Sequence, residues 1–159
     1  MGLHSVKAFS TYASSLRAVT LHEQWDCQVA KVGGKVFALI GLDSGHITFA
    51  GGDAVEMLRK HVKRVCHVHC KDVRPDVIRL ARNRNWSFLE SVINGAFTVP
   101  GDGAVDFPAL VGVLRESGYE GWLVVEAEQD PVIAPSYAYA EKGYRTLRAL
   151  VDGTYKEAA

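Results

Sequence analysis

Short apolar runs separated by polar segments dominate the chain from residue 35 onward. The segments 35–42, 65–70 and 121–128 are rich in apolar residues, and each leads into polar or turn-forming residues. Runs of this length and composition are typical of β-strands, and a near-continuous apolar strand is typical of a sheet buried on both faces. The pattern therefore predicts three strands of a buried sheet.

Helical spacing of apolar residues marks the segments between and after these strands. Val55, Leu58 and Val62 form one stripe, and the preceding Asp53 is of a type that caps helices. The expected helices span residues 54–62, 75–97 (one or two helices), 107–118 and 135–151, and the expected loops span residues 43–53 and 98–106.

The order of these elements predicts the fold class. Strands alternate with helices, as in the βα repeat of a parallel sheet. Crossover connections between parallel strands are right-handed, which leaves two architectures: an open doubly wound sheet, or a piece of a closed barrel. The sequence therefore predicts an α/β protein of parallel βα repeats.

The first 34 residues give weaker signals than the rest of the chain. The segment 8–25 is compatible with an amphipathic helix, and Gly33-Gly34 indicates a turn. We therefore expect an N-terminal segment over residues 1–34, followed by a βα domain over residues 35–159.

Composition and charge exclude several classes of function. The chain has 18 basic and 18 acidic residues, so its net charge of zero argues against nucleic-acid binding through a basic face. No apolar run is long enough to span a membrane, and we expect a cytoplasmic protein with no membrane partner. A P-loop, a dinucleotide-binding glycine fingerprint, a C-x-x-C pair and a G-x-S-x-G nucleophile motif are absent from the sequence.

The second predicted strand carries both histidines and cysteines. Strand alternation places His67, His69 and Lys71 on one face, and Cys66 and Cys70 on the other. Cys70 is therefore not expected to be activated by its neighbours His69 and Lys71. The three cysteines of the chain have no framework spacing, and we expect reduced thiols.

Side chains that can bind a metal follow all three predicted strands. The first strand leads into Asp43 and His46, the second ends near His69, and the third leads into Glu126 and Glu128. The carboxyl ends of parallel strands converge on one site in α/β folds. A mixed set of carboxylate and imidazole ligands suits Mn²⁺, Co²⁺, Fe²⁺, Mg²⁺ or Zn²⁺.

Ordinary structural roles compete with the metal site for each residue. Asp43 can simply turn the chain, and His67, in mid-strand, is better explained as a core histidine. Lys71 and Arg74 can hold an anionic or polyhydroxyl ligand, although surface roles are more common. Glu126 carries the most weight, because an ionised carboxylate after an apolar strand is costly to bury without a cation. Glu128 lies nearer the loop, where solvation alone explains it.

Four stretches together resemble a known family. They read GLDSGHITFAGGD, HVHCKDVRP, SFLESVINGAFTVPGDGAVDF and GYEGWLVVEAEQDP, and the resemblance covers about residues 35–152. The chain resembles the C-terminal half of the inosose dehydratases, which belong to the xylose-isomerase-like superfamily of TIM barrels. The resemblance implies about half of such a barrel.

The resemblance also implies a cofactor and roles for five residues. Asp43, His69 and Glu126 match metal ligands, and the metal implied is Mn²⁺ or Co²⁺. His46 matches a histidine beside the substrate or a second metal, and Lys71 a position near the substrate. The reaction implied is the dehydration of 2-keto-myo-inositol, with a carboxylate such as Glu126 taking a proton.

The sequence departs from this family in length. The family enzymes are about twice as long, and their first half supplies another metal glutamate and much of the pocket. A half barrel exposes two strand edges, so we expect a homo-oligomer or a complementary half-barrel chain as partner. Two alternatives remain open: a non-catalytic remnant or binding module that keeps a weak metal site, and a sugar isomerase or epimerase of the same superfamily.

Overall fold

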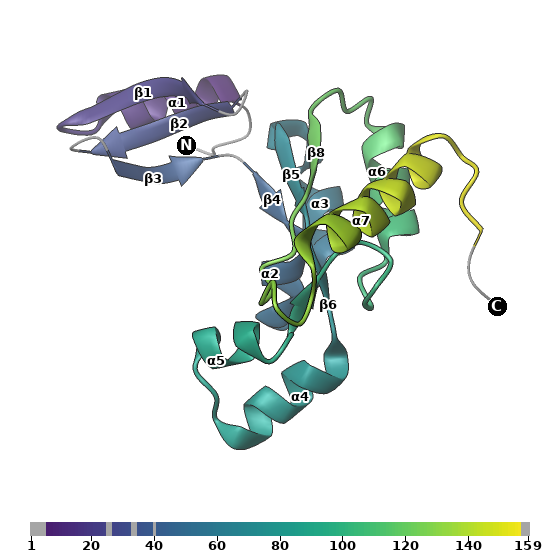
Figure 1. The fold of residues 1–159 in the computed structure, drawn as a ribbon. Coiled ribbons are helices and arrows are strands. Elements are labelled where there is room, and N and C mark those ends of the chain that lie inside the picture. Colours follow the sequence, from purple (N-terminus) through teal and green to yellow (C-terminus); the bar gives the residue numbers. More distant parts are fainter. Residues whose placement is uncertain (1–5, 25–26, 33–34, 40, 157–159) are drawn as a thin grey trace.

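A parallel sheet of three short strands forms the centre of the fold. The computed structural model describes residues 6–24, 27–32, 35–39 and 41–156. The strands β4 (Leu42–Asp43), β5 (His67–Cys70) and β8 (Trp122–Val125) lie in the order β4-β5-β8, and both pairs are parallel (Figure 1). The register places Asp43 opposite His69 and Cys70 opposite Val125, so the three carboxyl ends lie side by side.

Helices connect these strands, as the apolar spacing predicts. The side chains of Asp53 and Asp106 cap two of the helices by accepting backbone N–H hydrogen bonds. The helices of this part of the chain are α2 (Ser44–Phe49), α3 (Ala54–His61), α4 (Pro75–Arg84), α5 (Phe88–Ile93), α6 (Phe107–Glu116) and α7 (Ser136–Val151), with a 3₁₀ turn at Val62–Arg64. The parallel βα repeat predicted from the sequence is confirmed, as an open and partial sheet.

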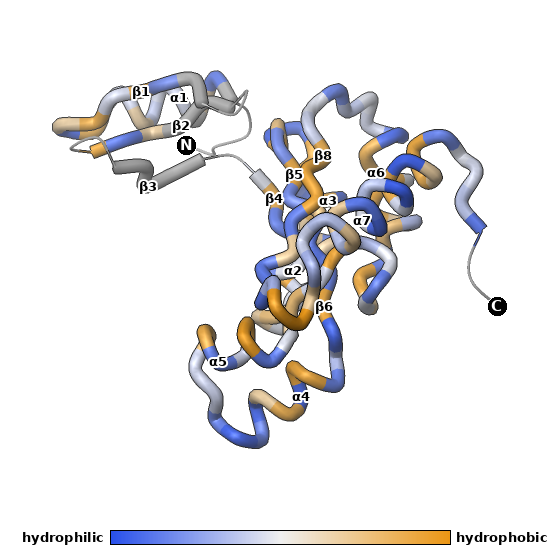
Figure 2. Tube along the Cα trace, in the orientation of Figure 1, coloured by the Kyte–Doolittle hydropathy of each residue, from blue (hydrophilic) through white to orange (hydrophobic). Residues whose placement is uncertain are grey.

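The main core lies between the sheet and the helices α3, α6 and α7. Val68 and Cys70 on β5 are fully buried, together with Leu58 of α3 and Leu110 of α6. The helix α3 packs against α6, and α6 packs against α7, which also contacts β8. Figure 2 shows the apolar residues that β8 contributes to this part of the molecule. Alternation along β5 therefore directs its apolar face into the core.

A two-stranded antiparallel pair extends the fold beyond β5. The strands β6 (Asp72–Val73) and β7 (Phe97–Thr98) lie in segments that the sequence assigned to a strand break, a helix end and a loop. These assignments were wrong, because a contact distant in sequence links the two segments: the buried carboxylate of Asp72 accepts from the N–H of Val73 in β6 and from the N–H groups of three residues in the loop after β7, namely Gly101, Gly103 and Val105. Gly103 allows this approach, because a Cβ there would meet Asp72 and the carbonyl of Val73.

The first loop predicted in the βα part is a helix. Residues Ser44–Phe49 form α2, and Asp43 caps this helix by accepting a hydrogen bond from the backbone N–H of His46 at 2.8 Å. The Asp-Ser-Gly sequence that indicated a turn is also compatible with a helix start, because aspartate serves both structures. The strand predicted after residue 121 is confirmed as β8, but it is only half buried, and Trp122 is exposed.

The described residues between 6 and 39 form one helix and a separate antiparallel sheet, whose third strand lies beyond the expected N-terminal segment of residues 1–34. The elements are α1 (Val6–Ser15), β1 (Val19–Gln24), β2 (Cys27–Val32) and β3 (Lys35–Leu39), with strand order β1-β2-β3 (Figure 1). The helix predicted over 8–25 is therefore wrong in its second half. The predicted strand 35–42 is divided between β3 and β4, because an apolar run suits a hairpin as well as a buried parallel strand.

The structure does not test the turn and the domain boundary that the sequence predicts near residue 34. The turn at residues 33–34 lies outside the described residues, and the domain boundary after residue 34 stays a prediction. Among the helices that the structure describes, none has the length and apolar character needed to cross a membrane.

Candidate metal and active site

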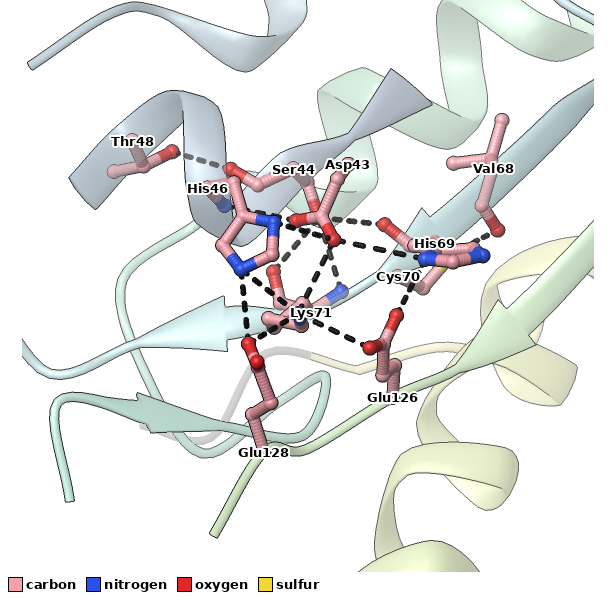
Figure 3. A network of polar contacts seen from close by, with 10 residues as sticks. All are labelled: Asp43, Ser44, His46, Thr48, Val68, His69, Cys70, Lys71, Glu126 and Glu128. Atoms are coloured by element: carbon pink, nitrogen blue, oxygen red, sulfur yellow. Dashed lines mark hydrogen bonds and ion pairs between the residues drawn. The ribbon is translucent and has the colours of Figure 1, made fainter. Parts of the chain in front are cut away.

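Three neighbouring strand ends bring Asp43, His69 and Glu126 together. One potential ligand atom from each residue lies within 4.8 Å of the others (Figure 3). Asp43 ends β4, His69 lies opposite it on β5, and Glu126 follows β8, with its backbone N–H bonded to the carbonyl of Cys70. The convergence expected from the sequence is therefore present in the structure.

The two oxygens of Asp43 have separate functions. Oδ1 caps α2, whereas Oδ2 faces the other polar groups of the site. Oδ2 lies 3.2 Å from His46 Nδ1, 3.2 Å from Lys71 Nζ and 3.6 Å from His69 Nδ1. The helix cap therefore fixes the direction in which the free oxygen of Asp43 points.

The donor atoms of this group fit a divalent cation. Oε2 of Glu126 is buried and makes no hydrogen bond to the described residues, although it lies 2.5 Å from His69 Nδ1. A buried carboxylate oxygen needs a positive or donating partner. Two carboxylates and one imidazole form a ligand set that suits Mn²⁺, Co²⁺ or Zn²⁺. The described residues therefore include a possible acidic and histidine metal site.

Lys71 is a fully buried cation at the centre of the cluster. Its Nζ lies 2.6 Å from Glu128 Oε2 and 3.2 Å from Glu126 Oε1. Burial alone would lower the pKa of Lys71, but the hydrogen bond to Glu128 and the nearby carboxylates outweigh burial and raise the pKa. Gly45 leaves room for the lysine stem, because a Cβ there would lie 2.6 Å from Lys71 Cγ. The surface role that the sequence favoured for Lys71 is wrong.

Two residues of the network have roles that the sequence did not predict. Ser44 anchors the backbone of Lys71. The Ser44 hydroxyl donates to the carbonyl of Lys71 at 2.7 Å and accepts from the backbone N–H of Lys71 at 3.1 Å. Glu128, expected to be merely solvated, lies 2.9 Å from His46 Nε2 and accepts the hydrogen bond of Lys71. Alternation along the third predicted strand places Glu128 on the same face as Glu126, and this was the one signal in the sequence that Glu128 could join the cluster.

Aromatic rings border the site beside His46. The His46 ring packs edge-on against Phe97 at 5.3 Å and is tilted against Phe88 at 5.9 Å between ring centroids. Phe97 is buried and also lies under the Lys71 ammonium at 5.5 Å, whereas Phe88 on α5 is half exposed. His46 therefore has one side against an apolar wall and its other side toward the carboxylates.

Other residues that the sequence analysis considered as functional candidates are not part of this cluster. His67 is buried, in keeping with its interpretation as a core histidine. Arg74 pairs with Asp102 at 2.6 Å and donates to backbone carbonyls, so its contacts are structural. Cys70 is a buried free thiol, and burial, with the charge of Asp43, raises the pKa of Cys70 to about 12. An activated thiol at Cys70 is therefore excluded.

The chain belongs to the xylose isomerase-like TIM barrel family. The family model matches residues 22–150, which includes all three strands of the parallel sheet and every residue of the cluster. The match begins earlier than the resemblance found in the sequence, within the N-terminal segment.

Curated relatives are about 50% identical to this chain over the aligned part. A rhizopine catabolism protein MocC of Rhizobium meliloti is 50% identical over 81% of this chain and 39% of its own length. An inosose dehydratase of Clostridium botulinum (strain Eklund 17B / Type B) is 49% identical over 67% of this chain and 36% of its own length. An inosose dehydratase of Geobacillus thermodenitrificans is 50% identical over the same shares. The chain thus spans 36–39% of the length of these relatives.

A solved structure titled D-tagatose 3-epimerase-like protein is also similar, with a TM-score of 0.47 and 20% identity. The alignment covers 70% of this chain and 34% of that chain. The family assignment does not depend on this likeness.

Proposed function

We propose that this chain takes part in inositol catabolism as a metal-dependent hydro-lyase, which dehydrates 2-keto-myo-inositol with Mn²⁺ or Co²⁺. The observation that carries the proposal is the convergence of Asp43, His69 and Glu126 at the strand ends. Relatives named inosose dehydratase, which are about 50% identical to this chain, support the reaction and its small polyhydroxy ketone substrate. An isomerase or epimerase has no such support among the named curated relatives described above.

Asp43, His69 and Glu126 would hold the metal. A bound divalent cation supplies Lewis-acid polarisation of a ketone, which acidifies the neighbouring C–H group. The remaining chemistry belongs to this chain. Dehydration requires a base for the C–H proton and an acid for the departing hydroxyl, and both must face the substrate.

In this proposal Glu126 and His46 carry out the two proton transfers. The Glu126 carboxylate would take the proton from the carbon beside the ketone. His46, with a side chain 45% exposed, would protonate the hydroxyl on the next carbon, which leaves as water. The buried ammonium of Lys71 offsets part of the negative charge of these carboxylates.

Turnover of 2-keto-myo-inositol is the direct test. With added Mn²⁺, we expect the diketone product to accumulate, by ultraviolet absorbance, with the chain alone or mixed with a first-half barrel chain. Glu126→Gln should abolish this turnover, since it removes both a ligand and a base, whereas Glu120→Gln in the exposed loop before β8 should not. Metal binding without turnover under either condition would favour the binding module, and a ketose epimer as product would favour an epimerase.

We also propose that the chain associates, either with a second copy or with a complementary half-barrel chain. In the described part of the chain β4 and β8 each pair on one side only, which leaves strand edges for a partner. Large apolar side chains at and after β8 are exposed, namely Trp122, Val132, Ile133 and Tyr137.

Association is measurable without knowing the substrate. At micromolar concentration, size-exclusion chromatography with light scattering should give at least twice the mass of the 17.4 kDa chain, because the free edges and apolar side chains favour self-pairing in the absence of another partner. Charged replacements at Val132 and Ile133, 87% and 74% exposed, should reduce that mass. A monomer at this concentration would reject the homo-oligomer and leave the complementary chain, tested by mixing.

A further inference from the structure

Glu128 is the strongest partner of the buried lysine. Its Oε2 accepts a hydrogen bond from Lys71 Nζ at 2.6 Å, whereas Asp43 and Glu126 lie at 3.2 Å as ion pairs (Figure 3). The same Glu128 oxygen lies 2.9 Å from His46 Nε2. One carboxylate therefore holds both basic side chains that border the candidate metal ligands.

The backbone at Glu128 has an unusual conformation. Its φ is +49°, a left-handed value that residues other than glycine rarely adopt. Conformations of this kind persist where surrounding contacts over-determine them, and they concentrate at functional sites. Here the chain has left β8, and the contacts with Lys71 and His46 still hold the carboxylate of Glu128 over the strand ends.

The charges of the cluster explain why such a carboxylate is needed. Lys71 is fully buried beside two of the three candidate ligands, so its ammonium competes with a divalent cation for Asp43 and Glu126. The carboxylates of Asp43, Glu126 and Glu128 and the ammonium of Lys71 together carry two negative charges. Without Glu128 these groups would carry a single negative charge, and the carboxylates left beside Lys71 would be those of the candidate ligands Asp43 and Glu126.

We propose that Glu128 is a positioning residue that holds Lys71 against its own carboxylate and so leaves Asp43 and Glu126 able to bind a divalent cation. This inference rests on the proposed metal site. It assigns to Glu128 neither contact with the metal nor proton transfer. It predicts that Glu128 acts on metal affinity through Lys71.

Calorimetric titration with MnCl₂ tests this role. Glu128→Gln should weaken Mn²⁺ binding by about tenfold or more, because the neutral amide no longer offsets a buried ammonium beside the ligands. Adding Lys71→Met to Glu128→Gln should restore most of the affinity, since the competing cation is gone. Glu120→Gln, the same change at an exposed position, should bind as the unaltered chain does. Circular dichroism of each variant reports whether it is folded.

The outcomes separate this inference from the metal site itself. Unchanged affinity in folded Glu128→Gln would overturn the inference and leave the metal site standing. Equal weakening in the single and double variants, both folded, would also overturn it, because Glu128 would then act independently of Lys71. If the unaltered chain does not bind Mn²⁺, the metal site fails, and the role of Glu128 fails with it. Should Lys71→Met not fold, Lys71→Gln replaces it, with the same expected restoration.

Discussion

Replacement of Asp43 by asparagine is expected to abolish Mn²⁺ binding while the fold persists. Asparagine caps helices as well as aspartate does, so the Oδ1 hydrogen bond to the N–H of His46 can be kept. The substitution removes the charged oxygen Oδ2, which faces His69 and Lys71. Replacing residues that merely support metal ligands costs about 10–100-fold in affinity, and removing a charged ligand should cost at least as much.

Asp53 provides the matched control for this prediction. It caps α3 by accepting from the N–H of Glu56, and it lies outside the cluster. Asp53→Asn should leave both Mn²⁺ affinity and melting temperature nearly unchanged. Calorimetry measures the affinity of each variant, and thermal unfolding followed by circular dichroism measures stability. Mn²⁺ binding by Asp43→Asn at the affinity of the unaltered chain would exclude Asp43 as a ligand.

Local signals explain why the helices were predictable. The segments beginning after Asp53 and Asp106 carry both a cap and an apolar stripe, and each is a helix in the structure. The helix α2 was missed because six residues are too few to show a period, and because Asp43 signals a turn as readily as a cap. Helices are thus set by contacts within four residues, which a sequence displays directly.

Strand partners were less predictable than strands. The apolar run 35–39 is a strand, as expected, but it pairs with β2 in an antiparallel sheet and not with β5. Periodicity reports which face of a strand is apolar, and it carries no information about the neighbour across the backbone. The strand β1 was missed because its residues lie in a segment, 8–25, that is also compatible with an amphipathic helix.

The candidate site was predictable where it depends on strand ends. Alternation and parallel topology were enough to place Asp43, His69 and Glu126 together. The burial of Lys71 was not predictable, because it depends on the absence of a side chain at Gly45, a contact across 26 residues. The role of Glu128 was not predictable for a related reason. Its position depends on a left-handed backbone conformation, which glutamate rarely adopts.

Replacement of Asp72 by alanine should cause a large loss of stability. The residue is 1% exposed, and its oxygens accept hydrogen bonds from the N–H groups of Val73, Gly101, Gly103 and Val105. Alanine would leave these donors without their acceptor, at a cost of about 1–3 kcal/mol for each donor that stays buried and unsatisfied. We expect the free energy of unfolding to fall by about 3 kcal/mol or more, measured by urea denaturation.

Asp76 separates this effect from the loss of a charge. Its carboxylate is 86% exposed and contacts Arg79 one turn further along α4, so Asp76→Ala should change stability by less than about 0.5 kcal/mol. A loss in Asp72→Ala no larger than in Asp76→Ala would mean that water replaces the carboxylate and that the four N–H groups are not held by it. A large loss would show that one buried side chain, next to Lys71, holds the loop of residues 99–106 and the pair of β6 and β7 in place. The metal ligands would then depend on a residue that takes no part in the chemistry.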